Sequence, residues 1–280
     1  MLRVAVPNKG SLSEIAAEML GEAGYSGRRD SRKLVHTDSR NEIEFFYLRP
    51  RDIATYVGSG ALDVGITGRD LLLDSGSEAR EIAHLDFGDS TFRFAAPKGS
   101  GITEIAQLAG MRVATSYPKL VDDFLRERGV EAVTVKLDGA VESAVQLGVA
   151  DAVADVVSTG ATLQAAGLVI FGPVILESTA VLIGGPSSQD GIDRLLRRLR
   201  GVLVARKFVL VDYDLEESKL EAAVSIAGGI ESPTVSPLRE DGWVAVRVMV
   251  LAEEANEVMD KLADLGARAI LVTAIHAARL

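Results

Sequence analysis

The chain has 280 residues, of which 48% are hydrophobic, 25% are charged and none is cysteine. This length predicts more than one domain, and a net charge of −10 excludes a general affinity for nucleic acid or an anionic membrane surface. The lack of cysteine excludes disulfides and thiolate sites, and no apolar run reaches the roughly 18–20 residues of a membrane span. With no signal-peptide pattern at the start, we expect a soluble, cytoplasmic protein.

Short runs rich in Val, Ile and Ala alternate with amphipathic segments over the first 185 residues. One amphipathic segment begins with Ser11 and Glu14, which have capping-box spacing, and ends at Gly24. This alternation predicts an α/β fold with a mainly parallel sheet and helices on both faces, whose ligands bind beyond the carboxyl ends of the strands. The predicted strands are residues 3–7, 44–48, 64–66, 92–96, 112–115, 133–137, 152–157 and 179–183.

Two segments of this first part resemble each other. Residues 60–68 and 148–160 each contain a helix end, an acidic residue, a strand and a Thr-Gly pair before another helix. Ancestral duplication and the general likeness of α/β units both account for the resemblance. Two similar lobes facing each other would form a cleft.

The last 75 residues have a different pattern. A loop at 184–188 marks the predicted boundary, and a basic helix is predicted over 194–200. The βαββαβ order of the elements that follow is the ferredoxin-like pattern, which predicts a separate small domain that binds regulators or oligomerises. Its predicted strands are 202–212, 232–238, 243–251 and 267–275, and its predicted helices are 215–227 and 253–265.

The segment from Asp155 to Thr162 carries the most specific local signal. A predicted strand ends in the turn Ser158-Thr159-Gly160, which begins a helix. Free N–H groups at a helix start, three hydroxyls and a glycine that lets the backbone approach closely would form a phosphate cradle. A plain helix N-cap at Ser158 or Thr159 explains the same residues.

Two acidic residues accompany this turn, namely Asp155 and, thirteen residues earlier, Glu142. A carboxylate beside a phosphate site is unfavourable unless it binds hydroxyls or a cation, and ribose hydroxyls and Mg²⁺ meet these needs. Glu142 is alternatively a favourable first-turn charge on its own helix. The chain contains neither a Walker A loop nor a Rossmann fingerprint, and its three histidines are isolated in sequence.

Cationic residues follow several predicted strands. Lys9 stands at the start of a helix, where a lysine is unfavourable unless an anion is bound. Arg49 and Arg51 follow the strand at 44–48, and Arg69 and Asp70 follow the strand at 64–66. Surface charge in loops is common, but the carboxyl ends of parallel strands share one edge of a sheet. We therefore expect these side chains to face a common anionic ligand.

A longer set of residues, with its spacing, resembles the signature of the ATP phosphoribosyltransferase family. The set is Glu142, Gly148, Ala150, Val153, Asp155, Val156, Thr159, Gly160, Thr162 and Leu163. The resemblance extends through residues 7–10, 65–68, 114–118 and 231–234, and the C-terminal domain resembles the long form of the family. Asp155 stands alone where the commoner phosphoribosyltransferase motif has two adjacent acids, which is consistent with the separate fold of this family.

The resemblance implies two periplasmic-binding-protein-like lobes that form a catalytic cleft, plus a ferredoxin-like regulatory domain. Lobe I would comprise residues 1–90 and 184–205, lobe II residues 91–183, and the regulatory domain residues 206–280. The implied reaction is the first step of histidine biosynthesis. N1 of ATP attacks C1′ of phosphoribosyl pyrophosphate (PRPP), giving N1-(5-phosphoribosyl)-ATP and pyrophosphate, with Mg²⁺ required. The resemblance also implies feedback inhibition by histidine, inhibition by AMP, and a homo-oligomer (dimer or hexamer).

Residue roles follow from combining the motifs with this resemblance. We predict that Asp155 binds the ribose hydroxyls and that Glu142 assists at the ribose or the metal. The other predicted roles form three sets. PRPP would bind Ser158, Thr159, Gly160, Ala161 and Thr162; ATP or pyrophosphate would bind Lys9, Arg49, Arg51, Asp70 and Tyr117; histidine would bind Asp214, Ser232 and Thr234.

Alternatives stay open at two of these positions, because Tyr117 is equally a structural tyrosine and Asp214 with Glu217 equally a helix-capping pair. A different class of protein, a non-catalytic solute-binding module with a fused sensor domain, would have the same two-lobed architecture. The carboxylates beside the phosphate loop and the absence of a secretion signal argue against that module.

Overall fold

The computed structural model describes residues 1–27, 32–186, 191–230 and 232–279. Ser187 and Ser188 of the predicted boundary loop, and Glu231 of the 231–234 motif, lie outside these residues. The chain divides into two compact units, one of residues 1–18 with 25–193 and the other of residues 19–24 with 194–280. None of the described helices is both long enough and apolar enough to cross a membrane.

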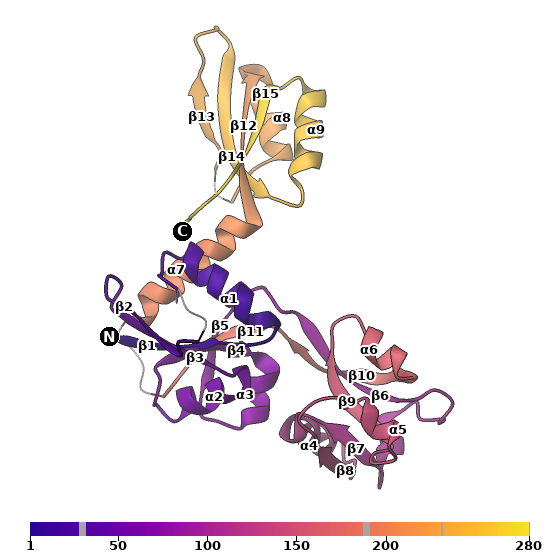
Figure 1. The fold of residues 1–280 in the computed structure, drawn as a ribbon. Coiled ribbons are helices and arrows are strands. Elements are labelled where there is room, and N and C mark those ends of the chain that lie inside the picture. Colours follow the sequence, from indigo (N-terminus) through magenta and orange to yellow (C-terminus); the bar gives the residue numbers. More distant parts are fainter. Residues whose placement is uncertain (28–31, 187–190, 231, 280) are drawn as a thin grey trace. The chain divides into compact units, whose positions relative to one another are not determined.

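A six-stranded sheet with the order β2-β3-β1-β4-β11-β5 forms the first part of the larger unit (Figure 1). All five residues of β4 are buried, and Ile53 and Val57 of α2 pack on this sheet with Ala5 and Val181. The strands are β1 (Leu2–Pro7), β2 (Val35–Asp38), β3 (Ile43–Leu48), β4 (Val64–Gly68), β5 (Arg80–His84) and β11 (Ala180–Gly184), and the helices are α1 (Ser11–Glu22), α2 (Pro50–Gly58) and α3 (Arg69–Ser75).

A five-stranded sheet with the order β10-β6-β9-β7-β8 forms the second part of the same unit. It has a separate hydrophobic cluster on each face, with Phe94 and Phe124 in one and Val153 and Leu163 in the other. The strands are β6 (Ser90–Pro97), β7 (Arg112–Thr115), β8 (Val133–Lys136), β9 (Ala152–Val157) and β10 (Leu168–Ser178), and the helices are η1 (Ile105–Leu108), α4 (Pro118–Glu127), α5 (Ser143–Gln146) and α6 (Ala161–Ala165).

Both sheets are mixed, so the prediction of a mainly parallel sheet is wrong. Strand β1 is parallel to β3 and β4, and β7 is parallel to β8 and β9, but the other pairings in these sheets are antiparallel. Three of the antiparallel pairings involve β2, β5 and β10, which the apolar pattern does not reveal, and two others join predicted strands, β4 with β11 and β6 with β9, whose direction the pattern does not contain. Strand β5 has charged residues at its start, and β10 contains Gly172 and Pro173, which read as a loop.

The second unit contains the ferredoxin-like fold that the sequence predicts. Its sheet has the order β13-β14-β12-β15, and every pairing in it is antiparallel. Val211, Tyr213 and Leu215 of β12 pack with Ala223 of α8 and Leu262 of α9, so both helices cover one face of the sheet (Figure 1). The elements are β12 (Phe208–Glu216), η2 (Glu217–Lys219), α8 (Leu220–Ile226), β13 (Thr234–Pro237), β14 (Trp243–Leu251), α9 (Ala255–Leu265) and β15 (Arg268–Ala274).

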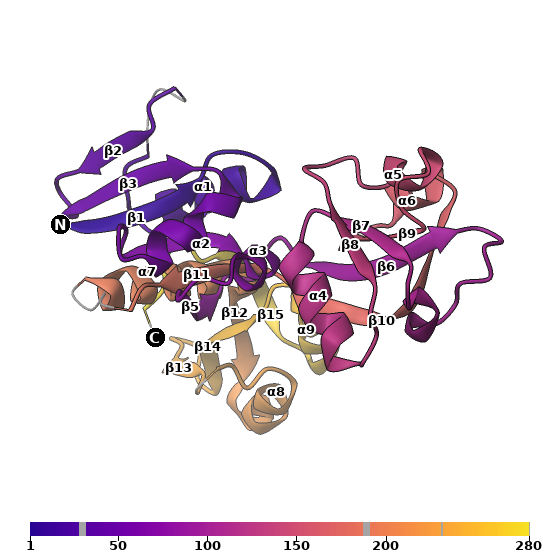
Figure 2. The same cartoon turned by 90° about the horizontal axis from the view of Figure 1, so that it is seen from below.

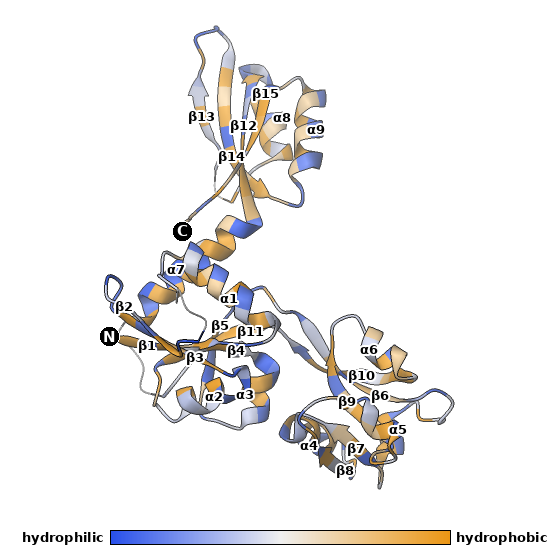
Figure 3. Cartoon of the chain, viewed as in Figure 1, coloured by the Kyte–Doolittle hydropathy of each residue, from blue (hydrophilic) through white to orange (hydrophobic). Residues whose placement is uncertain are grey.

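One long helix, α7 (Ile192–Lys207), precedes this domain, so the predicted strand over 202–212 begins too early. Leu195, Leu199 and Val202 are buried and have helical spacing, so the apolar residues after 200 continue the buried stripe of the helix. Hydrophobic and hydrophilic segments alternate along α7 (Figure 3). Residues 194–207 belong to the second unit and β11 to the first sheet. The predicted lobes divide the chain differently at these points, and their limits stay a prediction.

Asp38 closes the end of β2 by a buried cluster of hydrogen bonds. Its carboxylate accepts from the backbone N–H of Ser26 at 2.8 Å, and from the backbone N–H and side-chain amide of Asn41 at 3.1 and 2.7 Å. Burial raises the pKa of Asp38, but these hydrogen bonds outweigh it and bring the pKa to about 2.

We expect Asp38→Ala to lower the free energy of unfolding by about 2 kcal/mol at pH 7, because buried donors lose their acceptor. The folded pKa lies below the ordinary value of 3.8, so the ionised carboxyl stabilises the fold above about pH 4. This contribution is lost as the pH falls from about 4 towards 2, and the two proteins should converge there. Urea denaturation at several pH values measures the difference. Asp138→Ala, at an exposed loop position, is the control, and an equal loss there would contradict the prediction.

Candidate active site

A cavity of about 220 Å³ lies at the carboxyl ends of strands from both sheets of the first unit. Lys9 follows β1, Asp70 follows β4 and Tyr117 follows β7, so three predicted site residues line one cavity. This agrees with the rule that α/β sheets bind ligands at these strand ends. The full lining is Lys9, Gly10, Ser11, Leu12, Pro50, Gly68, Asp70, Leu71, Gly88, Ser90, Tyr117, Val156 and Ser178.

The turn that carries Lys9 is held against β3 by Asn8. The backbone N–H of Asn8 donates to the carbonyl of Leu48 at 2.8 Å, and its side-chain amide donates to the carbonyl of Tyr47 at 3.2 Å. The remaining side-chain oxygen, Oδ1, is buried and has no hydrogen-bond partner within the described part of the chain. Asn8 therefore presents an unused acceptor beside Lys9, a feature that the sequence does not indicate.

Asp70 and Tyr117 form a polar contact that joins the two sheets. Ser178 donates its hydroxyl to Oδ1 of Asp70 at 2.8 Å and accepts the Asp70 backbone N–H at 3.1 Å. Burial raises the pKa of the Tyr117 hydroxyl, and the charge of Asp70, to which it is hydrogen-bonded, raises it further. The phenol therefore stays protonated. The Tyr117 ring also meets Phe92 edge-on, with 5.1 Å between centroids, so it both lines the cavity and packs on the core.

Asp155 is largely buried within β9, next to Val156 of the cavity lining. Burial raises the pKa of its carboxyl, and the charges of Glu142 and Asp70 raise it further. The Val156 N–H, which donates to Oδ1 of Asp155 at 2.8 Å, opposes the shift. Asp155 is thus close enough to Glu142 and to Asp70 to be repelled by each of them, although Asp155 and Glu142 do not line the cavity. Glu142 directly precedes α5, as the sequence predicts, and its side chain makes no capping hydrogen bond.

The predicted phosphate loop leads from β9 into α6. Gly160 has φ +76°, a left-handed conformation that favours glycine, and α6 extends for only five residues. The Thr159 hydroxyl accepts the Ala161 N–H at 3.4 Å. Ser158 lines a further cavity of about 440 Å³, together with Ser90 and Ser178, which also line the first cavity. The two cavities are therefore adjacent.

The two predicted arginines lie at the start of α2, outside the lining of the first cavity. Arg49 is exposed and directly precedes the helix. Arg51 forms an ion pair with Asp74 at 3.1 Å, and its Cζ lies 4.7 Å from the centre of the Tyr117 ring. Arg51 is therefore at the edge of the cavity, because Tyr117 belongs to its lining.

The predicted histidine-binding residues lie apart in the C-terminal sheet. Asp214 is in β12, so its interpretation as a helix-capping residue is wrong. Thr234 is in β13, and β14 runs between β13 and β12, which separates these strands by about 9–10 Å. Ser232 is exposed and precedes β13. One copy of the chain does not bring the three residues into a single cluster.

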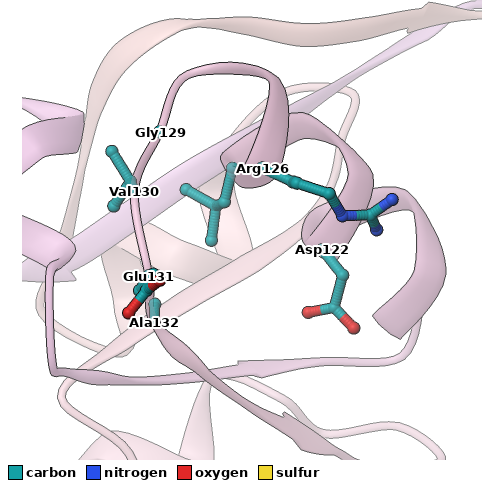
Figure 4. Close-up of a pocket in the computed structure, with 7 residues that line it drawn as sticks. Asp122, Arg126, Gly129, Val130, Glu131 and Ala132 are labelled. Carbon is teal, nitrogen blue, oxygen red and sulfur yellow. The ribbon is translucent and has the colours of Figure 1, made fainter.

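A third cavity, of about 340 Å³, lies beside the carboxyl end of α4 and contains none of the predicted site residues (Figure 4). Arg126 and Asp122 lie on the helical side of this cavity, and the loop that leads to β8 forms the other side. Among the described residues, no cluster of three or more His, Cys, Asp or Glu side chains could hold a metal ion. The strand-end cavity is therefore the candidate active site.

Comparison with known proteins identifies the family. Residues 49–201 match the family model described as HisG, ATP phosphoribosyltransferase, and residues 205–277 match the HisG C-terminal domain. The curated ATP phosphoribosyltransferases of Paenarthrobacter aurescens and Micrococcus luteus are 62% and 59% identical to this chain, with 100% of each sequence covered. The solved ATP phosphoribosyl transferase (HisG:HisZ) complex from Thermotoga maritima aligns with a TM-score of 0.63 at 28% identity, covering 72% of this chain and 98% of that one.

These matches confirm the resemblance seen in the sequence. The first family model alone spans more than half of the chain, and the second matches the ferredoxin-like domain. The curated relatives align with the chain from end to end. The chain therefore belongs to the ATP phosphoribosyltransferase family.

Proposed function

We propose that this chain joins ATP and PRPP at the strand-end cavity and the phosphate loop beside it. The observation that carries this proposal is the meeting of Lys9, Asp70 and Tyr117 in one cavity, in a chain of this family. In the reaction, N1 of the adenine forms a bond to C1′ of PRPP. The bond from C1′ to the pyrophosphate oxygen breaks, and its electron pair leaves with pyrophosphate.

PRPP would bind through the loop Ser158–Thr162 and Asp155. The left-handed Gly160 places no Cβ against an approaching phosphate, and the hydroxyls of Ser158 and Thr159 are exposed. Asp155 would accept hydrogen bonds from the ribose hydroxyls, with Glu142 assisting. The mutual repulsion of these carboxylates supports this role, because hydroxyl donors or a cation relieve it.

Catalysis would rest on positioning and on charge stabilisation, without a covalent nucleophile. Positive charge develops at C1′ as the pyrophosphate departs, and Asp155 is the anion proposed to bind the ribose. Negative charge gathers on the pyrophosphate, and Lys9 is the cation that lines the cavity. Arg49 and Arg51, at the start of α2, would contact the phosphates of ATP or pyrophosphate.

Asp155 and Glu142 would also suit a magnesium ion that is bound jointly by the protein and the substrate. Mg²⁺ is usually held by one or two carboxylates together with substrate phosphates and water, and Asp155 with Glu142 offers that number of ligands. A magnesium site built from protein ligands alone would need more carboxylates, and the described residues contain no cluster of three or more such side chains that could hold a metal ion. When bound, Mg²⁺ would neutralise the charge of the departing pyrophosphate.

The test is pyrophosphate release from ATP, PRPP and Mg²⁺. We expect release that requires both substrates, stops when a chelator removes the metal and returns when Mg²⁺ is restored. AMP should inhibit by competing at the cavity. If calorimetry shows binding of these ligands but no pyrophosphate forms, the chain acts as a solute-binding module instead, and the proposed function is wrong.

The C-terminal domain would bind histidine and inhibit turnover, with a cytoplasmic homo-oligomer as the working form. The separation of Asp214 from Thr234 supports a site completed by a second copy of the chain.

We expect Asp214→Ala to raise the histidine concentration for half-inhibition at least about tenfold, because an ammonium group loses its carboxylate partner. Turnover without histidine should be unchanged. Inhibition assays on the variant and on the control Asp260→Ala, at an exposed position of α9, check this, and unaltered inhibition would reject Asp214.

A further inference from the structure

One carboxylate, that of Asp74, connects three helices beside the candidate active site. Asp74 lies near the end of α3, and its side chain is only 8% exposed. Its Oδ1 accepts the backbone N–H of Leu120 in α4 at 3.2 Å, and its Oδ2 accepts Nη1 of Arg51 in α2 at 3.1 Å. Helices α3 and α4 lie side by side in both views of the fold (Figures 1 and 2).

The start of α4 depends on this contact. Tyr117 precedes the helix without a side-chain cap, and the first helical residue is Pro118. Leu120 carries one of the N–H groups that have no acceptor within the helix, and Asp74 provides that acceptor from another element. A negative charge at this end of a helix is also favourable.

The end of α3 also lies close to the start of α4. Gly76 ends α3 with φ +60°, and a Cβ at this position would lie 2.9 Å from Cε of Lys119. The Lys119 side chain is flexible and could move aside, but the left-handed φ of Gly76 would strain any larger residue at this position. The Asp74 carboxylate is nearly enclosed and Arg51 is 44% exposed, so their pair is stronger than one between two exposed side chains.

Arg51 and Leu120, the two partners of Asp74, are each close to Tyr117 of the cavity lining. Arg51 stacks over the ring of Tyr117, with 4.7 Å from Cζ to the ring centre, and Tyr117 lines the cavity. Leu120 is three residues after Tyr117, so a fixed start of α4 also fixes the backbone that carries the ring. A change at Asp74 therefore reaches the cavity along both the guanidinium and the helix.

We propose that Asp74 is a positioning residue of the active site, which holds Arg51 and Tyr117 in place for the phosphates of ATP or pyrophosphate. Asp74 itself does not line the cavity, so it acts through Arg51. This inference rests on the proposed function in one respect, namely that Arg51 faces those phosphates. A purely structural role, in which Asp74 only caps α4, would affect stability without this dependence on Arg51.

A double-mutant cycle separates the two roles. Wild type, Asp74→Ala, Arg51→Ala and the double variant are each titrated with ATP and with inorganic pyrophosphate by calorimetry. We expect Asp74→Ala to weaken binding of at least one ligand about tenfold in the wild-type background, but by no more than about threefold when Arg51 is already absent and only the contact with Leu120 remains to be lost. An equal loss in both backgrounds, or no loss for either ligand, would overturn the proposal.

Two further variants control for folding. Asp74→Asn keeps an oxygen for the Leu120 N–H but removes the charge that holds Arg51, so it should lower the melting temperature less than Asp74→Ala does and still bind more weakly. Asp123→Ala removes an acidic residue of α4 that pairs only locally with Lys119 and Arg126, and it should bind normally. Wild-type pyrophosphate release is measured separately. Its absence would refute the proposed function, whereas the binding cycle decides the role of Asp74.

Discussion

Replacing Asp155 with asparagine is expected to lower kcat by about a thousandfold while leaving the fold intact. The amide has nearly the same shape as the carboxylate, so the packing within β9 should persist. It has no charge to stabilise the positive centre that forms at C1′, and it binds ribose hydroxyls and a cation less well. Pyrophosphate release measures the effect, and urea denaturation should give a free energy of unfolding within about 1 kcal/mol of the wild type.

A matched control lies four residues earlier. Asp151 precedes β9 and forms an exposed ion pair with Arg112 at 2.8 Å. Asp151→Asn should leave kcat unchanged, because exposed pairs contribute little and this one is remote from the cavity lining. Near-normal turnover in Asp155→Asn, or an equal loss in both variants, would reject Asp155 as the proposed catalytic residue.

Replacing Lys9 with alanine is expected to lower kcat/KM by about a hundredfold, the usual scale for losing one group that stabilises transition-state charge. Lys9 is the lysine of the cavity lining, and it stands at the start of α1, where a cation is unfavourable unless an anion is bound. Removing it should therefore impair catalysis without lowering stability. Steady-state kinetics with each substrate varied, together with thermal melting, tests both parts of this expectation.

The control for Lys9 is a lysine outside the cavity lining. Lys98 is exposed and follows β6, and Lys98→Ala should retain normal kcat/KM. Lys9→Arg should recover part of the lost activity, because it restores the charge with a different shape. If alanine at position 9 leaves kcat/KM within about twofold of the wild type, Lys9 does not contact the reacting phosphates.

The pattern of apolar residues predicts the bounds of a helix or strand correctly where one face of that element is uniformly apolar. Strands β7, β9 and β14 begin and end where the sequence predicts, and α9 ends at Gly266, which takes the left-handed conformation. The prediction failed where a pattern continued beyond its element, as in α7. It also failed where a strand carries charges or glycine, as in β5 and β10. Such strands are held by pairing with neighbours, which a local pattern does not contain.

The sequence by itself determined the α/β class, the ferredoxin-like C-terminal domain and the family, because these depend on periodicity and on a long spaced motif. Only the tertiary structure decided that the two sheets are mixed and that Lys9, Asp70 and Tyr117 meet in one cavity. It also decided that Asp74 connects Arg51 to the start of α4. The physical reason is that burial and electrostatic coupling act between residues distant in the chain, so an acidic residue in a short helix becomes significant only when its partners are brought beside it.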